Sequence, residues 1–130
     1  MGPETAGRTT YTDASLQGWG AIMGYNTARG EWPGATTTHI NVLELEAVWL
    51  ALHFASSLQG RQTLVMTDSM TTKAYINRQG GIKSEACRSW ARCIWLWVAS
   101  NAISIRALHV PGKNYDAETS YREGARTQTI

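Results

Sequence analysis

The sequence predicts a single α/β domain built on a mixed five-stranded sheet that is flanked by helices. The first third contains short segments of β-branched and aromatic residues, separated by turns and close enough for an antiparallel meander. Helices and strands then alternate, which implies parallel pairing through right-handed crossovers. The length of 130 residues fits one compact core and leaves no room for a second domain.

The first part of the chain predicts three strands, with β-branched, aromatic and glycine residues in the first two. The expected elements are a strand at Thr9–Asp13, a strand at Gly18–Tyr25, a turn at Asn26–Gly30 and a third strand that begins at Glu31 and Trp32. A long helix rich in leucine, alanine and glutamate is predicted at Asn41–Leu58, where Gly60 follows its end.

The second part predicts strands and helices in alternation. The expected elements are a strand at Arg61–Thr67, a helix at Ser69–Gln79, a helix at Ser84–Asn101 that Ser84 caps, a strand at Ile103–Val110 and a short helix at 116–123. We therefore expect a flexible leader at 1–8, one domain at 9–123 and a tail at 124–130.

Composition excludes several classes of protein. The net charge of +2 permits contact with nucleic acid but does not predict it. Cys87 and Cys93 are too few for a disulfide framework or a zinc site, so we expect reduced thiols in an intracellular compartment, cytoplasmic or nuclear. No apolar run predicts a signal peptide or a membrane span, and we expect the isolated domain to be monomeric.

Two aspartates lie at predicted strand ends. Asp13 closes the first strand, and Asp68 closes the strand that follows the long helix. Ligands of such sheets collect at the carboxyl ends of the parallel strands. The two carboxylates are therefore placed to share a site if their strands are neighbours.

The long helix offers two glutamates, Glu44 and Glu46, and its periodicity separates them. Successive residues turn by about 100°. Glu44 shares its face with small apolar residues that suit packing against a sheet, among them Ala47 and Ala51. Glu46 shares a bulkier and more mixed face with Trp49. We therefore expect Glu44 to point inward and Glu46 to face solvent.

A cluster of carboxylates indicates a divalent cation, because unpaired carboxylates repel each other and are costly to desolvate. Mg²⁺ prefers oxygen ligands and suits a sparse carboxylate site that also binds phosphate, and Mn²⁺ is an alternative. Two such ions can stabilise both oxygens of a phosphodiester displacement. Taken singly, each acid also fits a plain role as turn former or helix cap.

Several motifs together resemble the ribonuclease H domain of retroelement polyproteins, most closely that of gypsy-like and DIRS-like retrotransposons. The likeness runs from about Tyr11 to about Arg122. Its motifs are Thr12-Asp13-Ala14-Ser15, Gly18-Trp19-Gly20-Ala21, Asn41-Val42-Leu43-Glu44-Leu45-Glu46-Ala47, Thr67-Asp68-Ser69 and His109-Val110-Pro111-Gly112-Lys113. Each motif alone is weak, and their order and spacing make the set specific.

The resemblance implies a five-stranded mixed sheet with helices on both sides, and hydrolysis of the RNA strand of RNA–DNA hybrids with two metal ions. It also implies a reverse transcriptase domain in the same parent polyprotein. Asp13, Glu44 and Asp68 match the family's catalytic carboxylates. Three polar residues match positions that touch the nucleic-acid backbone, although each also fits a role as turn former or cap: Ser15, Asn41 and Ser69.

The C-terminal segment departs from the family pattern. Ala117-Glu118 stands where the family has Ala-Asp, in a loop that is one residue shorter. Glu118 is the expected fourth catalytic and metal-binding carboxylate, with Asp116 as its competitor. The departure leaves open a second reading, a catalytically degenerate module of the same fold that binds nucleic acid or another protein. A DNA-directed nuclease of the same superfamily and a plain α/β domain whose acids are caps are further alternatives.

Overall fold

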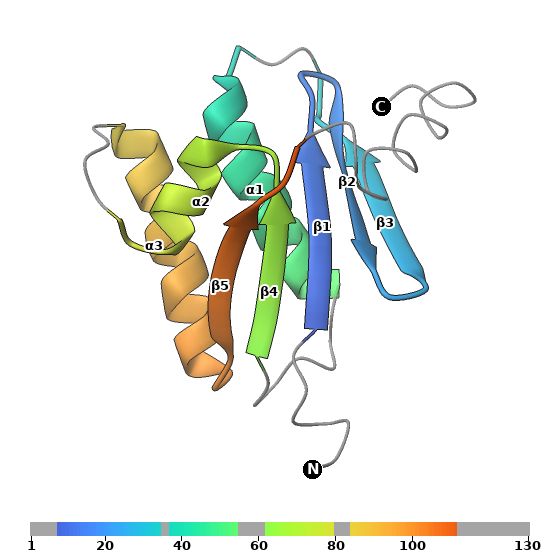
Figure 1. The fold of residues 1–130 in the computed structure, drawn as a ribbon. Helices are drawn as coiled ribbons and strands as arrows, with labels where there is room; N and C mark the ends of the chain where they lie inside the picture. The colour runs from blue at the N-terminus through green and yellow to red at the C-terminus, as the bar shows by residue number, and fades with distance from the viewer. Residues whose placement is uncertain (1–7, 35–36, 55–61, 80–83, 112–130) are drawn as a thin grey trace.

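A computed structural model describes residues 8–34, 37–54, 62–79 and 84–111 of the chain. These residues form five strands and three helices (Figure 1). In chain order they are β1 (Arg8–Ala14), β2 (Gly18–Met23), β3 (Asn26–Glu31), α1 (Ile40–Phe54), β4 (Gln62–Thr67), α2 (Met70–Ile76), α3 (Glu85–Ser100) and β5 (Ser104–His109).

The strands form one mixed five-stranded sheet, as the sequence predicts, and their order in it is β3-β2-β1-β4-β5. The β1–β2 and β2–β3 pairs are antiparallel, and β4 pairs in parallel with both β1 and β5. Tyr11 lies beside Met66 in the β1–β4 register, so β1 and β4 end at the same edge of the sheet. This register is what brings Asp13 and Asp68 to one place.

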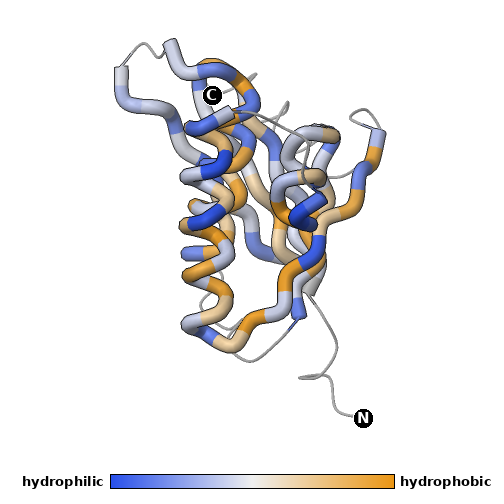
Figure 2. Tube along the Cα trace, turned by 90° about the vertical axis from the view of Figure 1, so that its left-hand side faces the viewer, coloured by the Kyte–Doolittle hydropathy of each residue, from blue (hydrophilic) through white to orange (hydrophobic). Residues whose placement is uncertain are grey.

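The three helices contact one another and cover one face of the sheet, as Figures 1 and 2 show. Alternate residues of the strands face these helices and are buried, among them Thr12, Val65 and Ala107. In Figure 2, α3 alternates hydrophobic and hydrophilic residues around its axis. Its periodicity predicts an inward stripe of Cys87, Trp90, Ala91, Ile94 and Val98. All of these are buried except Trp90, which is partly exposed. None of the helices in the described ranges has the length and the apolar run that crossing a bilayer requires.

The core between helices and sheet is aliphatic at its centre and aromatic at its rim. Leu45, Val48 and Ile94 are fully buried where α1 meets α3. Trp49 packs edge-on against Trp90 and Trp97 at the rim of this contact. The α3 tryptophans Trp90, Trp95 and Trp97 pack against this core. Of the two thiols, Cys87 is buried, whereas Cys93 lies on the exposed side of α3 rather than near the core.

The third strand begins earlier than the sequence predicts. The predicted turn at Asn26–Gly30 is wrong, because those residues form most of β3. Met23 pairs with Asn26, so the chain reverses through Gly24 and Tyr25 alone. Gly24 has φ +67, the backbone conformation that a two-residue hairpin turn requires at its first position. The sequence pattern does not predict this strand, because its residues are polar and mostly exposed and show no alternation of apolar and polar residues.

Element ends differ from the predicted ends by a few residues. β1 starts at Arg8, which the prediction placed in the leader. α2 is shorter than Ser69–Gln79, because Ser69 is its N-cap and Arg78 takes φ 56 just beyond its end. The C-terminal end predicted for the long helix, the helix predicted at 116–123 and the tail lie outside the described residues.

Candidate metal centre

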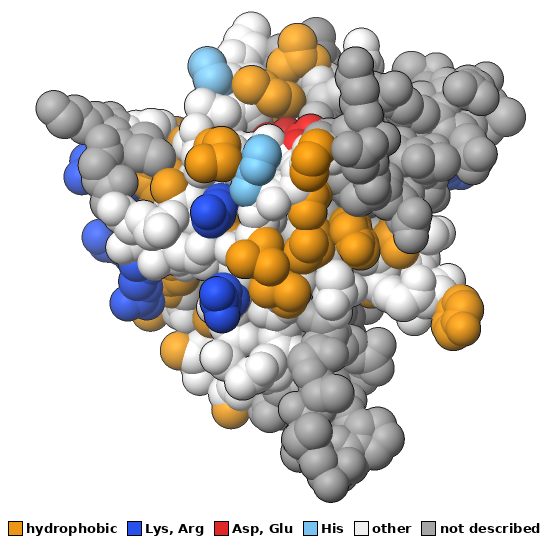
Figure 3. Space-filling view, in the orientation of Figure 1, with side chains coloured by type: hydrophobic (Ala, Val, Ile, Leu, Met, Phe, Trp, Pro, Cys, Tyr) orange, Lys and Arg blue, Asp and Glu red, His pale blue; other side chains and the backbone are white. Residues whose placement is uncertain are grey.

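Three carboxylates from three elements meet at the carboxyl edge of the sheet. Asp13 lies near the end of β1, Asp68 directly follows β4, and Glu44 lies in α1. One carboxylate oxygen from each lies within 4.8 Å of the others. In Figure 3, acidic side chains reach the surface near this edge of the sheet. The convergence that the strand ends and the helix face predict is confirmed.

The packing of α1 directs Glu44 into the cluster. Glu44 is only 7% exposed, and it shares the buried side of the helix with Ala47, Val48 and Ala51. Glu46 is half-buried and is not a member of the cluster. The sequence-based choice of Glu44 over Glu46 is therefore confirmed, although Glu46 is less exposed than predicted.

Burial makes the cluster electrostatically costly without a cation. Burial, together with the negative charges of Asp13 and Asp68, raises the pKa of Glu44 from 4.5 to about 9. The Oε1 atom of Glu44 is buried with no hydrogen-bond partner among the described residues. An oxygen in this state is satisfied by a cation, and a set of carboxylate oxygens is the ligand type that Mg²⁺ and Mn²⁺ prefer. The residues present thus fit a divalent metal.

The start of α1 depends on a residue that the sequence analysis did not assign to the site. The Nδ1 atom of His39 accepts a hydrogen bond from the backbone N–H of Asn41 at 3.0 Å. The His39 carbonyl accepts the N–H groups of Val42 and Leu43. Histidine is not a usual capping residue, so no sequence signal marked this role. The ring of His39 fixes the first turn of α1, and with it the position of Glu44.

The loop after β1 is fixed by its own hydrogen bonds and by a buried tryptophan. The Oγ of Ser15 accepts the N–H groups of Gln17 and Gly18, so Ser15 has the turn-forming role that was one of its two predicted roles. The indole N–H of Trp32 donates to the Ser15 carbonyl at 2.7 Å. Asp13 accepts the N–H of Ala14 at 2.9 Å. These bonds hold Asp13 and its loop in one arrangement.

Ser69 caps α2 directly after Asp68. Its Oγ accepts the N–H of Thr72 at 3.0 Å, and its own N–H donates to the Oγ1 of Thr67 at 3.0 Å. The capping role that the sequence left open for Ser69 is thus present. Asn41 lies in the first turn of α1, three residues before Glu44. The expected fourth carboxylate, Glu118, and its competitor Asp116 lie outside the described residues.

The cap at Ser69 gives a direct test of local stability. We expect Ser69→Ala to lower the free energy of unfolding by about 1 kcal/mol, because the N–H of Thr72 loses its acceptor. Ser69→Asn, which can still cap, should recover most of this loss. Urea denaturation followed by tryptophan fluorescence measures both variants. Equal stability of Ser69→Ala and the wild type would show that the cap contributes nothing.

No family model matches the chain, and no curated protein matches it in sequence. Its fold, however, is similar to solved structures. LC11-RNase H1 in complex with an RNA/DNA hybrid, a protein isolated from compost, aligns with a TM-score of 0.70 at 21% identity, over 86% of this chain and 91% of that one. RNase H1 of Halobacterium salinarum aligns with a TM-score of 0.74 at 15% identity, over 95% of this chain and all of that one.

A third solved structure, the N-terminal RNase H domain of a Mycobacterium tuberculosis protein, aligns with a TM-score of 0.64 at 15% identity, over 91% of this chain and 99% of that one. The strand order and the mixed pairing of the sheet agree with this likeness. The chain therefore has the ribonuclease H fold.

Proposed function

We propose that the protein is an endonuclease that hydrolyses the RNA strand of RNA–DNA hybrids with two divalent metal ions. The observation that carries the proposal is the meeting of Asp13, Glu44 and Asp68 within 4.8 Å at the carboxyl edge of the sheet. The fold adds support, because a protein with which it aligns is seen in complex with an RNA/DNA hybrid.

Asp13, Glu44 and Asp68 would hold the two ions, with Glu118 as a proposed fourth ligand. Such ions, when bound, neutralise charge on the phosphate and activate water. The chain's own residues prepare the site for them. Burial of Glu44 places one acidic oxygen where bulk water competes little for it. The bond from the Ala14 N–H orients the carboxylate of Asp13.

Recognition of the hybrid is proposed to rest on its shape and sugars. A wide, shallow minor groove exposes the 2′-hydroxyls of the RNA strand to small polar side chains. Ser15 and Ser69 lie within two residues of Asp13 and Asp68, and Asn41 lies one helical turn from Glu44. The hydroxyl hydrogen of Ser69 can still donate to a nucleic-acid oxygen while its Oγ caps α2. Contacts of this kind predict little sequence preference.

Cleavage of a labelled hybrid tests the proposal. We expect Mg²⁺-dependent cutting of the RNA strand, with no cutting in EDTA and none of duplex DNA or duplex RNA of the same sequence. Binding of the hybrid without cutting, in Mg²⁺ and in Mn²⁺, would indicate the catalytically degenerate module instead. Cutting of duplex DNA would indicate the DNA-directed nuclease.

The two glutamates of α1 provide a matched pair of variants. We expect Glu44→Gln to lower kcat at least about 100-fold, because an ionised ligand of the metal is replaced by a neutral amide. Glu46→Gln, which makes the same chemical change outside the cluster, should leave kcat within about twofold. Steady-state cleavage of the hybrid measures both variants. A large loss in Glu46→Gln with none in Glu44→Gln would contradict the assigned cluster.

We also propose, from the motif resemblance, that the domain belongs to a retroelement polyprotein with a reverse transcriptase domain in cis, and that it acts as a monomer inside the cell. The motifs around Asp13, Glu44 and Asp68 are the support for this context. The exposed thiol of Cys93 fits a reducing compartment. Sequencing the gene on both sides of this region tests the proposed context, because a reverse transcriptase reading frame should precede it.

A further inference from the structure

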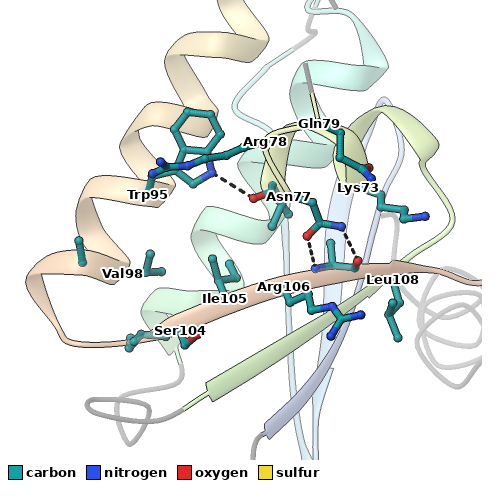
Figure 4. Close-up of a pocket in the computed structure, with 14 residues that line it drawn as sticks. Lys73, Asn77, Arg78, Gln79, Trp95, Val98, Ser104, Ile105, Arg106 and Leu108 are labelled. Atoms are coloured by element: carbon teal, nitrogen blue, oxygen red, sulfur yellow. Dashed lines mark hydrogen bonds between the residues drawn. The ribbon is translucent and has the colours of Figure 1, made fainter. Parts of the chain in front are cut away.

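A groove of about 750 Å³ runs along the outer edge of β5, between that strand, α2 and the C-terminal half of α3. Its lining includes the apolar residues Ile76, Val98 and Ile103. It also includes Lys73, Arg78 and Arg106, although the Arg106 side chain extends from the far side of β5 (Figure 4). No aspartate or glutamate of the described residues lines it. The charge of this groove therefore favours an anionic ligand.

The groove begins next to the candidate metal centre. α2 starts at its cap Ser69, which directly follows Asp68, and Lys73 lies about 6 Å further along the helix axis. On the opposite wall, Leu108 of β5 pairs with Met66 of β4. Met66 lies two residues before Asp68 in the sequence. The two walls of the groove thus start on elements that adjoin Asp68, α2 along the chain and β5 through its pairing with β4.

The edge of β5 is closed to a pairing strand. β5 is last in the strand order, so an extended peptide could in principle add to it. Asn77 prevents this, because its Nδ2 donates to the Ala107 carbonyl and its Oδ1 accepts the Ala107 N–H, both at 2.8 Å (Figure 4). The backbone groups at the middle of the strand are therefore occupied. Recognition in this groove must rest on its side chains, which favours nucleic acid over a pairing peptide.

The aromatic and cationic groups of the rim suit a polynucleotide. The guanidinium of Arg78 lies 4.3 Å from the centre of the Trp95 ring, and the indole N–H donates to the Ile76 carbonyl at 3.2 Å. The stacked arginine still presents its outer face, on which a base can stack, and N–H groups that bind phosphate. Figure 4 shows Arg106 on the other side of β5 from Asn77, where a second phosphate can be met.

We propose that this groove binds a single strand of nucleic acid that continues beyond the hybrid held at the metal centre. Arg78 and Arg106 bind its phosphates, and the Arg78–Trp95 stack supports a base. The inference rests on the proposed function, because the strand is the continuation of the hybrid substrate.

Fluorescence anisotropy with labelled duplexes tests the groove in an Asp68→Asn background, where the RNA stays uncut. The probes are a blunt RNA–DNA hybrid and the same hybrid with a single-stranded DNA tail of about ten nucleotides, at the 3′ or the 5′ end. We expect one tailed hybrid to bind about 10-fold more tightly than the blunt one. Arg78→Gln/Arg106→Gln should abolish this advantage and reduce the salt slope for the tailed hybrid by about 1.4, since each phosphate contact to a single strand contributes about 0.7.

The matched control is Arg88→Gln/Arg92→Gln, which removes two exposed charges of α3 that do not line the groove. It should keep the advantage of the tailed hybrid. Equal affinity for blunt and tailed hybrids in the Asp68→Asn background, or equal loss in both double variants, would overturn the groove assignment. A polyglutamate peptide and an oligothymidylate of equal charge should be compared as competitors of the tailed hybrid. If both displace the tail at the same concentration, the groove does not prefer nucleic acid, and an acidic protein partner replaces the proposed strand.

Cleavage of the blunt hybrid by the wild type separates this inference from the function itself. If the wild type cuts the blunt hybrid but the tailed hybrid binds no more tightly than the blunt one, only the proposed role of the groove is contradicted. A tail advantage without any cutting supports the groove as a nucleic-acid site and contradicts the nuclease.

Discussion

Replacing Asp68 with asparagine is expected to abolish hybrid cleavage while the protein remains folded. The carboxylate of Asp68 shares one site with those of Asp13 and Glu44, and an amide in its place removes a negative ligand oxygen. We expect kcat to fall at least about 1000-fold, which corresponds to about 4 kcal/mol of transition-state stabilisation. In EDTA the variant should be more stable than the wild type by on the order of 1 kcal/mol, because one charge of a repelling cluster is gone.

This opposite behaviour of activity and stability distinguishes a metal ligand from a structural acid. Cleavage kinetics and urea denaturation measure the two quantities on the same protein. Glu31→Gln, a change of the same charge at the exposed end of β3, is the control and should alter neither. A variant at Asp68 that is strongly destabilised in EDTA would show that this carboxylate has a structural role.

The free energy of unfolding of the metal-free protein is expected to fall as the pH rises. Folding raises the pKa of Glu44 from 4.5 to about 9, so between these values the folded state holds a proton that the unfolded state has released. The stabilisation from this proton is complete below about pH 4.5 and is lost as the pH rises through about 9. The expected slope is on the order of 1 kcal/mol per pH unit between about pH 5 and about pH 8.

Denaturation curves in EDTA across this range measure the slope. Glu44→Gln removes the titrating group and should flatten it, whereas Glu31→Gln should retain it. Saturating Mg²⁺ should also flatten it, because binding ionises Glu44 in the folded state and releases its proton. An equal slope in the wild type and in Glu44→Gln would show that Glu44 does not keep its proton in the metal-free protein.

The sequence predicted the centre of the site well, because strand ends and helix periodicity are local signals with a long-range consequence. Asp13 and Asp68 lie at the ends of two predicted strands, and the observed parallel pairing of β1 and β4 brings them together. Glu44 and Glu46 point in different directions around the axis of α1, and this difference alone places Glu44 on the buried face. The supporting bonds could not be predicted in this way. Trp32 donates its indole N–H to Ser15, a partner that only the folded chain brings within reach. His39 contacts Asn41, two residues along the chain, but histidine is not a residue type that marks a helix start.

The edges of the sheet were the least predictable part of the fold. β3 carries no apolar alternation, because it is an outer strand and is mostly exposed. At the other edge, Asn77 reaches across thirty residues of sequence to Ala107, and no local pattern marks that pair. The groove beside it depends on this contact and on the position of α3 against β5. Both are results of tertiary packing.

Calorimetric titration with Mn²⁺ tests the central claim, that three distant carboxylates bind divalent ions together. The wild type should bind Mn²⁺, and at an ion concentration of about 100 times Kd its free energy of unfolding should rise by about 2.7 kcal/mol. Asp13→Asn/Asp68→Asn should show neither the heat of binding nor the gain in stability. Equal binding by the wild type and this double variant would contradict the account.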